Sequence, residues 1–181
     1  MDLNEINKAF SSGKKKSYLS PKMEELINSL ILAEFNASQL YKAMKVWCEY
    51  AGYEGMAKYI KNQVLEERVH MNKLYEYSTD RQCIPTTPAV KSHPSKFKDL
   101  KDVVEKALEH EELIEDTYKK AVSLAWADKD YTTFSFLQWF LTEQIEEIKM
   151  FSGFLDRMEV AGCDKRGQYL FDAELLGKLK G

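Results

Sequence analysis

The chain has 181 residues, of which 44% are hydrophobic and 30% charged, and its formal net charge is −3. This size and balance indicate one globular domain of ordinary composition. The slightly negative charge and the absence of an apolar run near the roughly 20 residues of a membrane span lead us to expect neither a nucleic acid nor a membrane as partner.

Residues 1–19 are predicted to form a mobile arm, because two serines, a glycine and three lysines follow one another at 11–16. The arm contains Asp2 and Glu5 and no apolar stretch, so we expect no secretory signal. The chain has three cysteines, widely spaced and without a CxxC motif. They predict reduced thiols and a cytoplasmic protein.

Residues 20–181 predict a domain built from long amphipathic helices. The first helix should cover 21–50, with Ser20 as N-cap, Pro21 in the first turn and Gly52 as the stop. The second should cover 54–78, because its apolar residues recur at intervals of three and four.

The third helix is expected at 99–126, the fourth at 131–160 and a short fifth at 170–179. The connection at 80–97 holds three prolines and is long for a compact domain. We expect it to cross the length of a bundle, so that the second and third helices run parallel. The fold class is therefore all-α, a four-helix bundle of ferritin-like topology with a short C-terminal helix. The fifth helix either covers the end of the bundle or mediates assembly.

Each of the four long apolar stripes contains one carboxylate: Glu34, Glu67, Glu111 and Glu147, and His70 accompanies the second. In the third helix, the predicted inward positions are Val103, Ala107, Glu111, Ile114, Tyr118 and Val122. A buried carboxylate without a partner costs several kcal/mol. Four acids and an imidazole inside one bundle are instead explained by metal ions.

The spacing of Glu67 and His70 places both side chains on one helical face, where the carboxylate can bridge to a second metal. Carboxylates with imidazole suit iron and other divalent first-row metals, and the scattered cysteines argue against a structural zinc site. An isolated E-x-x-H pair is a weak signal. The acids on the neighbouring helices strengthen the interpretation of this pair as a metal site.

The sequence resembles bacterial non-haem ferritins over nearly all of residues 20–176. The segments that carry the resemblance are, in order, LILAEFNASQLYKAM, YEGMAKYIKNQVLEERVHMNKL, HEELI, FSFLQWFLTEQIEEIKMF and GQYLFDAELL. The resemblance implies a hollow shell of twenty-four copies. It also implies a di-iron ferroxidase centre in each subunit, which oxidises Fe(II) with dioxygen before Fe(III) is stored as a mineral.

By this resemblance, Glu34, Glu67 and His70 match the first iron site, and Glu67 matches the bridging ligand. Glu111 and Glu147 match the second iron site.

The resemblance also assigns residues around the iron pair. Gln144 matches a polar neighbour of the centre, and Tyr41 matches a tyrosine held close to it that could supply a further electron. A third iron site, which shares Glu147, matches Glu66, Glu143 and Glu146. The alternative for these three acids is a solvated helix face, and the alternative for Tyr41 is aromatic core packing.

Two departures from related families refine this interpretation. Bacterioferritins have a haem-ligating methionine where this chain has Arg68, so no haem is expected. Animal ferritins line a pore with acids where this chain has Phe134 and Leu137, so the sequence does not predict the iron entry route. Three other functions stay open: a di-iron oxygenase, a peroxide scavenger of the rubrerythrin kind, and a shell subunit that binds iron without catalysis.

Overall fold

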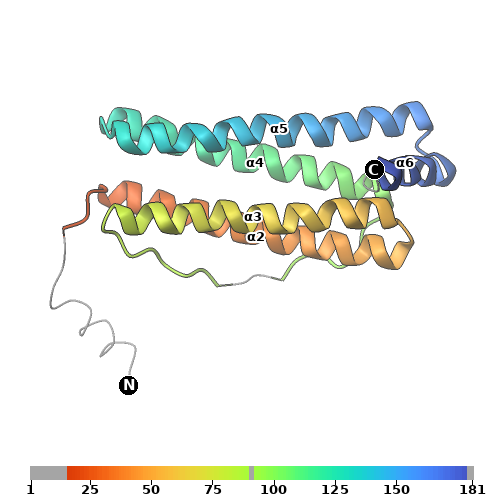
Figure 1. The fold of residues 1–181 in the computed structure, drawn as a ribbon, viewed down its shortest axis with the longest axis horizontal. Helices are drawn as coiled ribbons and strands as arrows, with labels where there is room; N and C mark the ends of the chain where they lie inside the picture. The colour runs from red at the N-terminus through yellow and green to blue at the C-terminus, as the bar shows by residue number, and fades with distance from the viewer. Residues whose placement is uncertain (1–15, 90–91, 179–181) are drawn as a thin grey trace, which may run out of the picture.

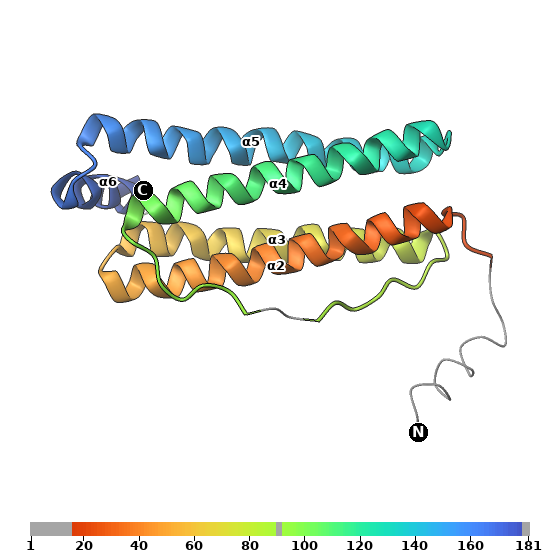
Figure 2. The same cartoon turned by 180° about the vertical axis from the view of Figure 1, so that it is seen from behind.

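The computed structural model describes residues 16–89 and 92–178, and within them it contains helices and loops but no strand. The helices are α2 (Pro21–Ala51), α3 (Glu54–Asp80), α4 (Leu100–Ala127), α5 (Tyr131–Ala161) and α6 (Lys165–Lys178). Figure 1 shows the four long helices side by side as two pairs, α2 with α3 and α4 with α5. The connection between α3 and α4 runs along the outside of the first pair from one end to the other (Figure 2). The predicted four-helix bundle and its parallel α3 and α4 are confirmed.

Polar caps and glycine set the ends of these helices. The Ser20 side chain accepts a hydrogen bond from the Met23 amide at 3.2 Å and so caps α2. Asp99 and Asp130 cap α4 and α5 in the same way. Gly52 ends α2 with a φ of +87°, a conformation that favours glycine.

The buried stripe of α4 differs from the prediction at one position. Val122 is only half-buried, and Ala121 and Ala125 are buried instead. The reason is that the stripe follows a seven-residue repeat, in which Tyr118 is followed by positions three and seven residues later. No helix among the described residues is long and apolar enough to cross a membrane.

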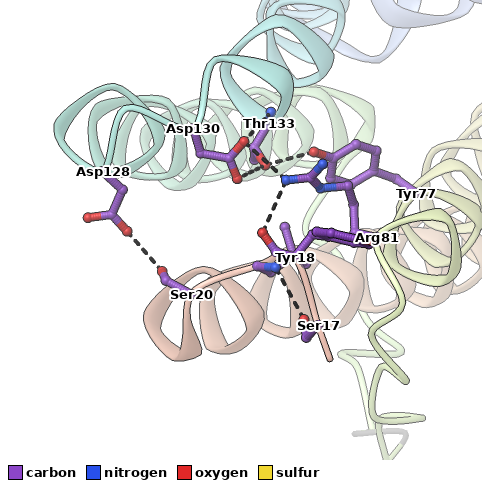
Figure 3. Close-up of polar contacts among 9 residues, drawn as sticks. Ser17, Tyr18, Ser20, Tyr77, Arg81, Asp128, Asp130 and Thr133 are labelled. Carbon is purple, nitrogen blue, oxygen red and sulfur yellow. Dashed lines mark hydrogen bonds and ion pairs between the residues drawn. The ribbon is translucent and has the colours of Figure 1, made fainter. Parts of the chain in front are cut away.

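The end of the predicted arm is attached to the bundle. Residues 1–15 lie outside the described residues, but the Tyr18 amide donates to the Arg81 carbonyl at 3.0 Å. The Arg81 guanidinium donates in turn to the Tyr18 carbonyl at 3.1 Å and to Asp130 at 3.4 Å (Figure 3). The Leu19 side chain is buried. These residues thus pack where α3 ends and α5 begins.

The fifth helix was predicted at 170–179 but begins at Lys165 and is described as far as Lys178. Position 179 lies outside the described residues. The earlier start has a local cause, since the Asp164 carboxylate accepts a hydrogen bond from the Gly167 amide at 2.8 Å. The first turn of α6 is polar, so the apolar pattern used for the prediction did not include it.

Helix α6 covers one end of the bundle and caps α3. Tyr53, which precedes α3, makes no side-chain capping bond. Instead the Asp172 carboxylate accepts hydrogen bonds from the amides of Gly55 at 3.1 Å and Met56 at 2.7 Å. A Cβ on Gly55 would lie 2.1 Å from the Asp172 carbonyl oxygen, so only glycine allows this approach. Helix α6 is therefore part of the packed bundle.

Candidate metal centre

The acids and the histidine of the four stripes meet inside the bundle. Glu34 of α2, Glu67 and His70 of α3, Glu111 of α4 and Glu147 of α5 are buried, each with at most 5% of its surface exposed. Ligand atoms of Glu34, Glu67 and His70 lie within 4.8 Å of one another, and so do those of Glu67, Glu111 and Glu147. Glu67 belongs to both groups. The arrangement therefore offers two neighbouring sites with one shared carboxylate.

The His70 imidazole is aimed at the carboxylates. Its Nδ1 lies 3.7 Å from Glu34 Oε2 and 3.4 Å from Glu67 Oε2. Trp139 and Phe140 pack edge-on against the ring, with centroids 5.4 and 6.0 Å from its own. These aromatic contacts from α5 fix the plane of the imidazole.

Hydrogen bonds hold Glu111 through both of its oxygens. The Tyr41 hydroxyl donates to Oε1, and the Gln144 amide donates to Oε2 at 2.9 Å. Gln144 also donates to the Glu111 carbonyl oxygen at 3.2 Å. The two residues that the family resemblance placed beside the centre therefore both contact Glu111.

Tyr118, which the apolar pattern of α4 predicts only as a core residue, also contacts the centre. The Tyr118 hydroxyl donates to Glu34 Oε1. The signal was present in the sequence, because Tyr118 follows Glu111 by the same seven residues that separate Tyr41 from Glu34.

Several carboxylate oxygens in the centre have no hydrogen-bond partner although they are buried. They are Oε2 of Glu34, Oε1 of Glu67 and both oxygens of Glu147. Leaving a buried acceptor unsatisfied costs about 1–3 kcal/mol, and more when it is charged. Hard cations such as iron prefer oxygen ligands of this kind, so the residues fit a pair of iron ions.

The model of the ferritin-like domain family matches residues 24–161 of the chain. The chain belongs to this family. It is 38% identical over 157 residues to a probable bacterial non-heme ferritin-like protein of Haemophilus influenzae, covering 87% of this chain and 95% of that protein. It is 35% identical over 157 residues to a bacterial non-heme ferritin of Escherichia coli O6:H1, with the same coverage. An open pore ferritin from Archaeoglobus fulgidus has a similar structure, with a TM-score of 0.84 and 29% identity over 88% of this chain and 98% of that chain.

Burial makes the centre of this ferritin-like domain bind protons when no cation is present. Burial, with the charges of Glu111 and Glu67, raises the pKa of Glu147 to about 12. Burial and the neighbouring charge of Glu34 raise the pKa of Glu67 well above its usual range. At neutral pH the Glu147 carboxyl therefore carries a proton, which must leave when a cation binds.

The pKa values of Glu34 and His70 shift in the directions expected of an ion pair. Burial opposes the charged form of Glu34, but the close approach of His70, whose Nδ1 lies 3.7 Å from Oε2, and of Glu67 outweighs it and lowers the pKa. Burial opposes the charged form of His70 as well, and the contact with Glu34 outweighs it and raises the pKa. Since a metal ligand must be neutral imidazole, cation binding competes with protonation of His70.

A third group of ligand atoms adjoins the pair. Atoms of Glu66, His70 and Glu147 lie within 4.8 Å of one another. Glu143 and Glu146 belong to no such group among the described residues. Glu146 is exposed and Glu143 half-buried, so both have access to water. The third iron site expected from the resemblance stays a prediction.

Proposed function

We propose that the chain is an iron-storage ferritin subunit that oxidises Fe(II) with dioxygen at the buried carboxylate centre. The observation that carries this proposal is the pair of ligand groups sharing Glu67, with unpartnered oxygens on Glu34, Glu67 and Glu147. Two Fe(II) ions bring four positive charges, which the four ligand glutamates neutralise. Loading the centre with its substrate thus relieves the cost of burying these acids.

In this proposal, Glu34 and His70 bind the first ion, Glu111 and Glu147 bind the second, and Glu67 bridges them. Dioxygen accepts one electron from each of the two Fe(II) ions and, with two protons, leaves as hydrogen peroxide. Carboxylates favour the Fe(III) product because they are hard anionic ligands.

Fe(III) then moves from the centre to a mineral inside a shell of twenty-four chains. Family membership and the exposed apolar residues Tyr169 and Leu170 on α6 support assembly. A third iron beside Glu66, together with Glu143, Glu146 and the shared Glu147, or the phenol of Tyr41, would supply a further electron. The free thiols of Cys48, Cys83 and Cys163 are consistent with the cytoplasmic location that we propose.

The other functions have less support. An oxygenase needs a substrate cavity beside the metals. Two surface hollows, of about 440 and 310 Å³, have none of the ligand residues in their lining, so a substrate in either would not contact the metals. A peroxide scavenger of the rubrerythrin kind needs an electron-donating metal domain, and the chain has only three cysteines. A subunit that only binds iron would not need the full ligand set.

The test is to add many equivalents of Fe(II) per chain in air and to follow ferric absorbance, soluble iron and particle size. We expect rapid oxidation with iron retained in a large soluble particle. Oxidation that stops after about two irons per chain in a monomer or dimer would refute storage and favour an oxygenase.

The matched variant is His70→Ala, which should slow the fast oxidation phase by at least about 10-fold, because losing even a partner that orients a metal ligand costs about 10–100-fold. The shell should still assemble, because His70 is buried inside its own bundle, with 2% of its surface exposed, and so cannot contact a neighbouring chain. Loss of assembly in this variant would contradict a purely catalytic role for His70.

A further inference from the structure

Helices α2 and α4 carry the same short pattern, a glutamate followed seven residues later by a tyrosine. The pairs are Glu34 with Tyr41 and Glu111 with Tyr118. Seven residues are close to two helical turns, so both members of a pair lie on one face. Because α2 and α4 run antiparallel (Figure 1), each tyrosine reaches the glutamate of the other helix. Tyr41 donates to Glu111 and Tyr118 donates to Glu34.

The two hydrogen bonds leave the two glutamates in different states. Glu111 is held through both oxygens, by Tyr41 and Gln144. Glu34 is held through Oε1 alone, and its Oε2 has no hydrogen-bond partner. That free oxygen lies 3.7 Å from Nδ1 of His70. The bond from Tyr118 thus divides the Glu34 carboxylate into one fixed oxygen and one oxygen available to a cation.

Burial and aromatic packing fix the position of the Tyr118 ring. It is fully buried and stacks on Phe140, with ring centroids 4.7 Å apart and an interplanar angle of 15°. Phe140 also packs edge-on against His70, at 6.0 Å. One aromatic side chain therefore sets the positions of both the phenol that holds Glu34 and the imidazole that faces it.

We propose that Tyr118 is a positioning residue that makes Glu34 a ligand through a single oxygen, Oε2, for the cation bound by His70. This inference rests on the proposed function, since it requires cations at Glu34 and His70. A carboxylate without this hydrogen bond is free to rotate and to offer either oxygen or both. Partners that orient a metal ligand typically contribute 10- to 100-fold to metal affinity.

The test uses Tyr118→Phe, which removes the hydroxyl and keeps the ring and its stack. Co(II) is the probe, because its visible absorption reports binding and it is not consumed by the oxidation reaction. We expect two Co(II) per wild-type chain and a 10- to 100-fold weaker affinity at one of them in the variant, which corresponds to about 1.4 to 2.8 kcal/mol.

The matched control is Tyr77→Phe. Tyr77 is also buried, stacks on Phe136 at 3.8 Å and bonds through its hydroxyl to Thr133. We expect unchanged Co(II) affinities in this control. An equal loss in both variants would mean that the effect comes from general loosening of the bundle, and it would overturn the positioning role.

A double variant assigns the affected site. In a His70→Ala background, the site that Tyr118 serves is already disabled, so adding Tyr118→Phe should leave the remaining Co(II) affinity unchanged within about twofold. A further tenfold loss would show that Tyr118 acts elsewhere and would overturn the inference.

The same measurements separate this inference from the proposed function. A wild-type protein that oxidises Fe(II) and binds Co(II), with both affinities unchanged in Tyr118→Phe, would overturn the inference alone. A wild-type protein that neither binds Co(II) nor oxidises Fe(II) would refute both.

Discussion

Replacing Glu147 by glutamine should stabilise the metal-free protein, and by more as the pH rises. The Glu147 carboxyl is 5% exposed, both oxygens lack partners, and its pKa is raised to about 12. Between pH 4.5 and 12 the unfolded chain has lost this proton and the folded chain keeps it. The stability contribution is thus complete below about pH 4.5 and is lost as the pH rises. One proton corresponds to about 1.4 kcal/mol per pH unit.

From pH 6 to pH 8 the free energy of unfolding of the wild type should therefore fall by about 3 kcal/mol relative to Glu147→Gln, which cannot ionise. The assay is equilibrium urea unfolding at pH 6, 7 and 8 with a chelator, at one protomer concentration because assembly also affects stability. Glu146→Gln is the control, since Glu146 is the adjacent residue and is exposed. The free energy of unfolding of Glu146→Gln should stay within about 0.5 kcal/mol of the wild-type value at each pH. A difference between wild type and Glu147→Gln that does not grow with pH would show that Glu147 does not keep its proton in the folded chain.

Three further predictions concern packing, capping and the third iron. Gly55→Ala should cost about 1–3 kcal/mol in urea unfolding, because its Cβ would meet the Asp172 backbone at 2.1 Å. The control is Gly153→Ala, which should be neutral or stabilising because nothing lies within 4 Å of the new Cβ. An equal loss of stability in the two variants would contradict the close approach of α6 to Gly55. Asp172→Ala should cost about 0.5–2 kcal/mol in the same assay, because α3 loses its cap, and an unchanged unfolding midpoint would show that water replaces the carboxylate. Glu143→Ala should change the ratio of iron oxidised to oxygen consumed more than the initial rate, and an unchanged ratio would argue against a third iron at this residue.

Local patterns in the sequence were enough to predict the four long helices. Ser20 and Gly52 mark the ends of α2 through capping and a positive φ, which depend only on neighbouring residues. The burial of Glu34 and Glu147 also followed from the sequence, because the spacing of apolar residues sets which face of a helix turns inward.

Other features depend on contacts between residues far apart in the chain. The cap of α3 comes from Asp172 on α6, and no residue near Tyr53 in the sequence predicts it. The early start of α6 was missed because its first turn is polar and owes its position to the Asp164 cap.

Helical periodicity is a property of one segment, so the sequence alone predicts that Glu34, Glu67, Glu111 and Glu147 face the core. The contacts that these acids make with one another and with other side chains follow from the tertiary structure. It placed Glu67 in both ligand groups, paired Tyr118 with Glu34 across two helices, and left the oxygens of Glu147 without partners. The physical reason is that pKa values, hydrogen bonds and metal coordination depend on distances of a few ångströms between different helices, and the packing of the bundle sets those distances.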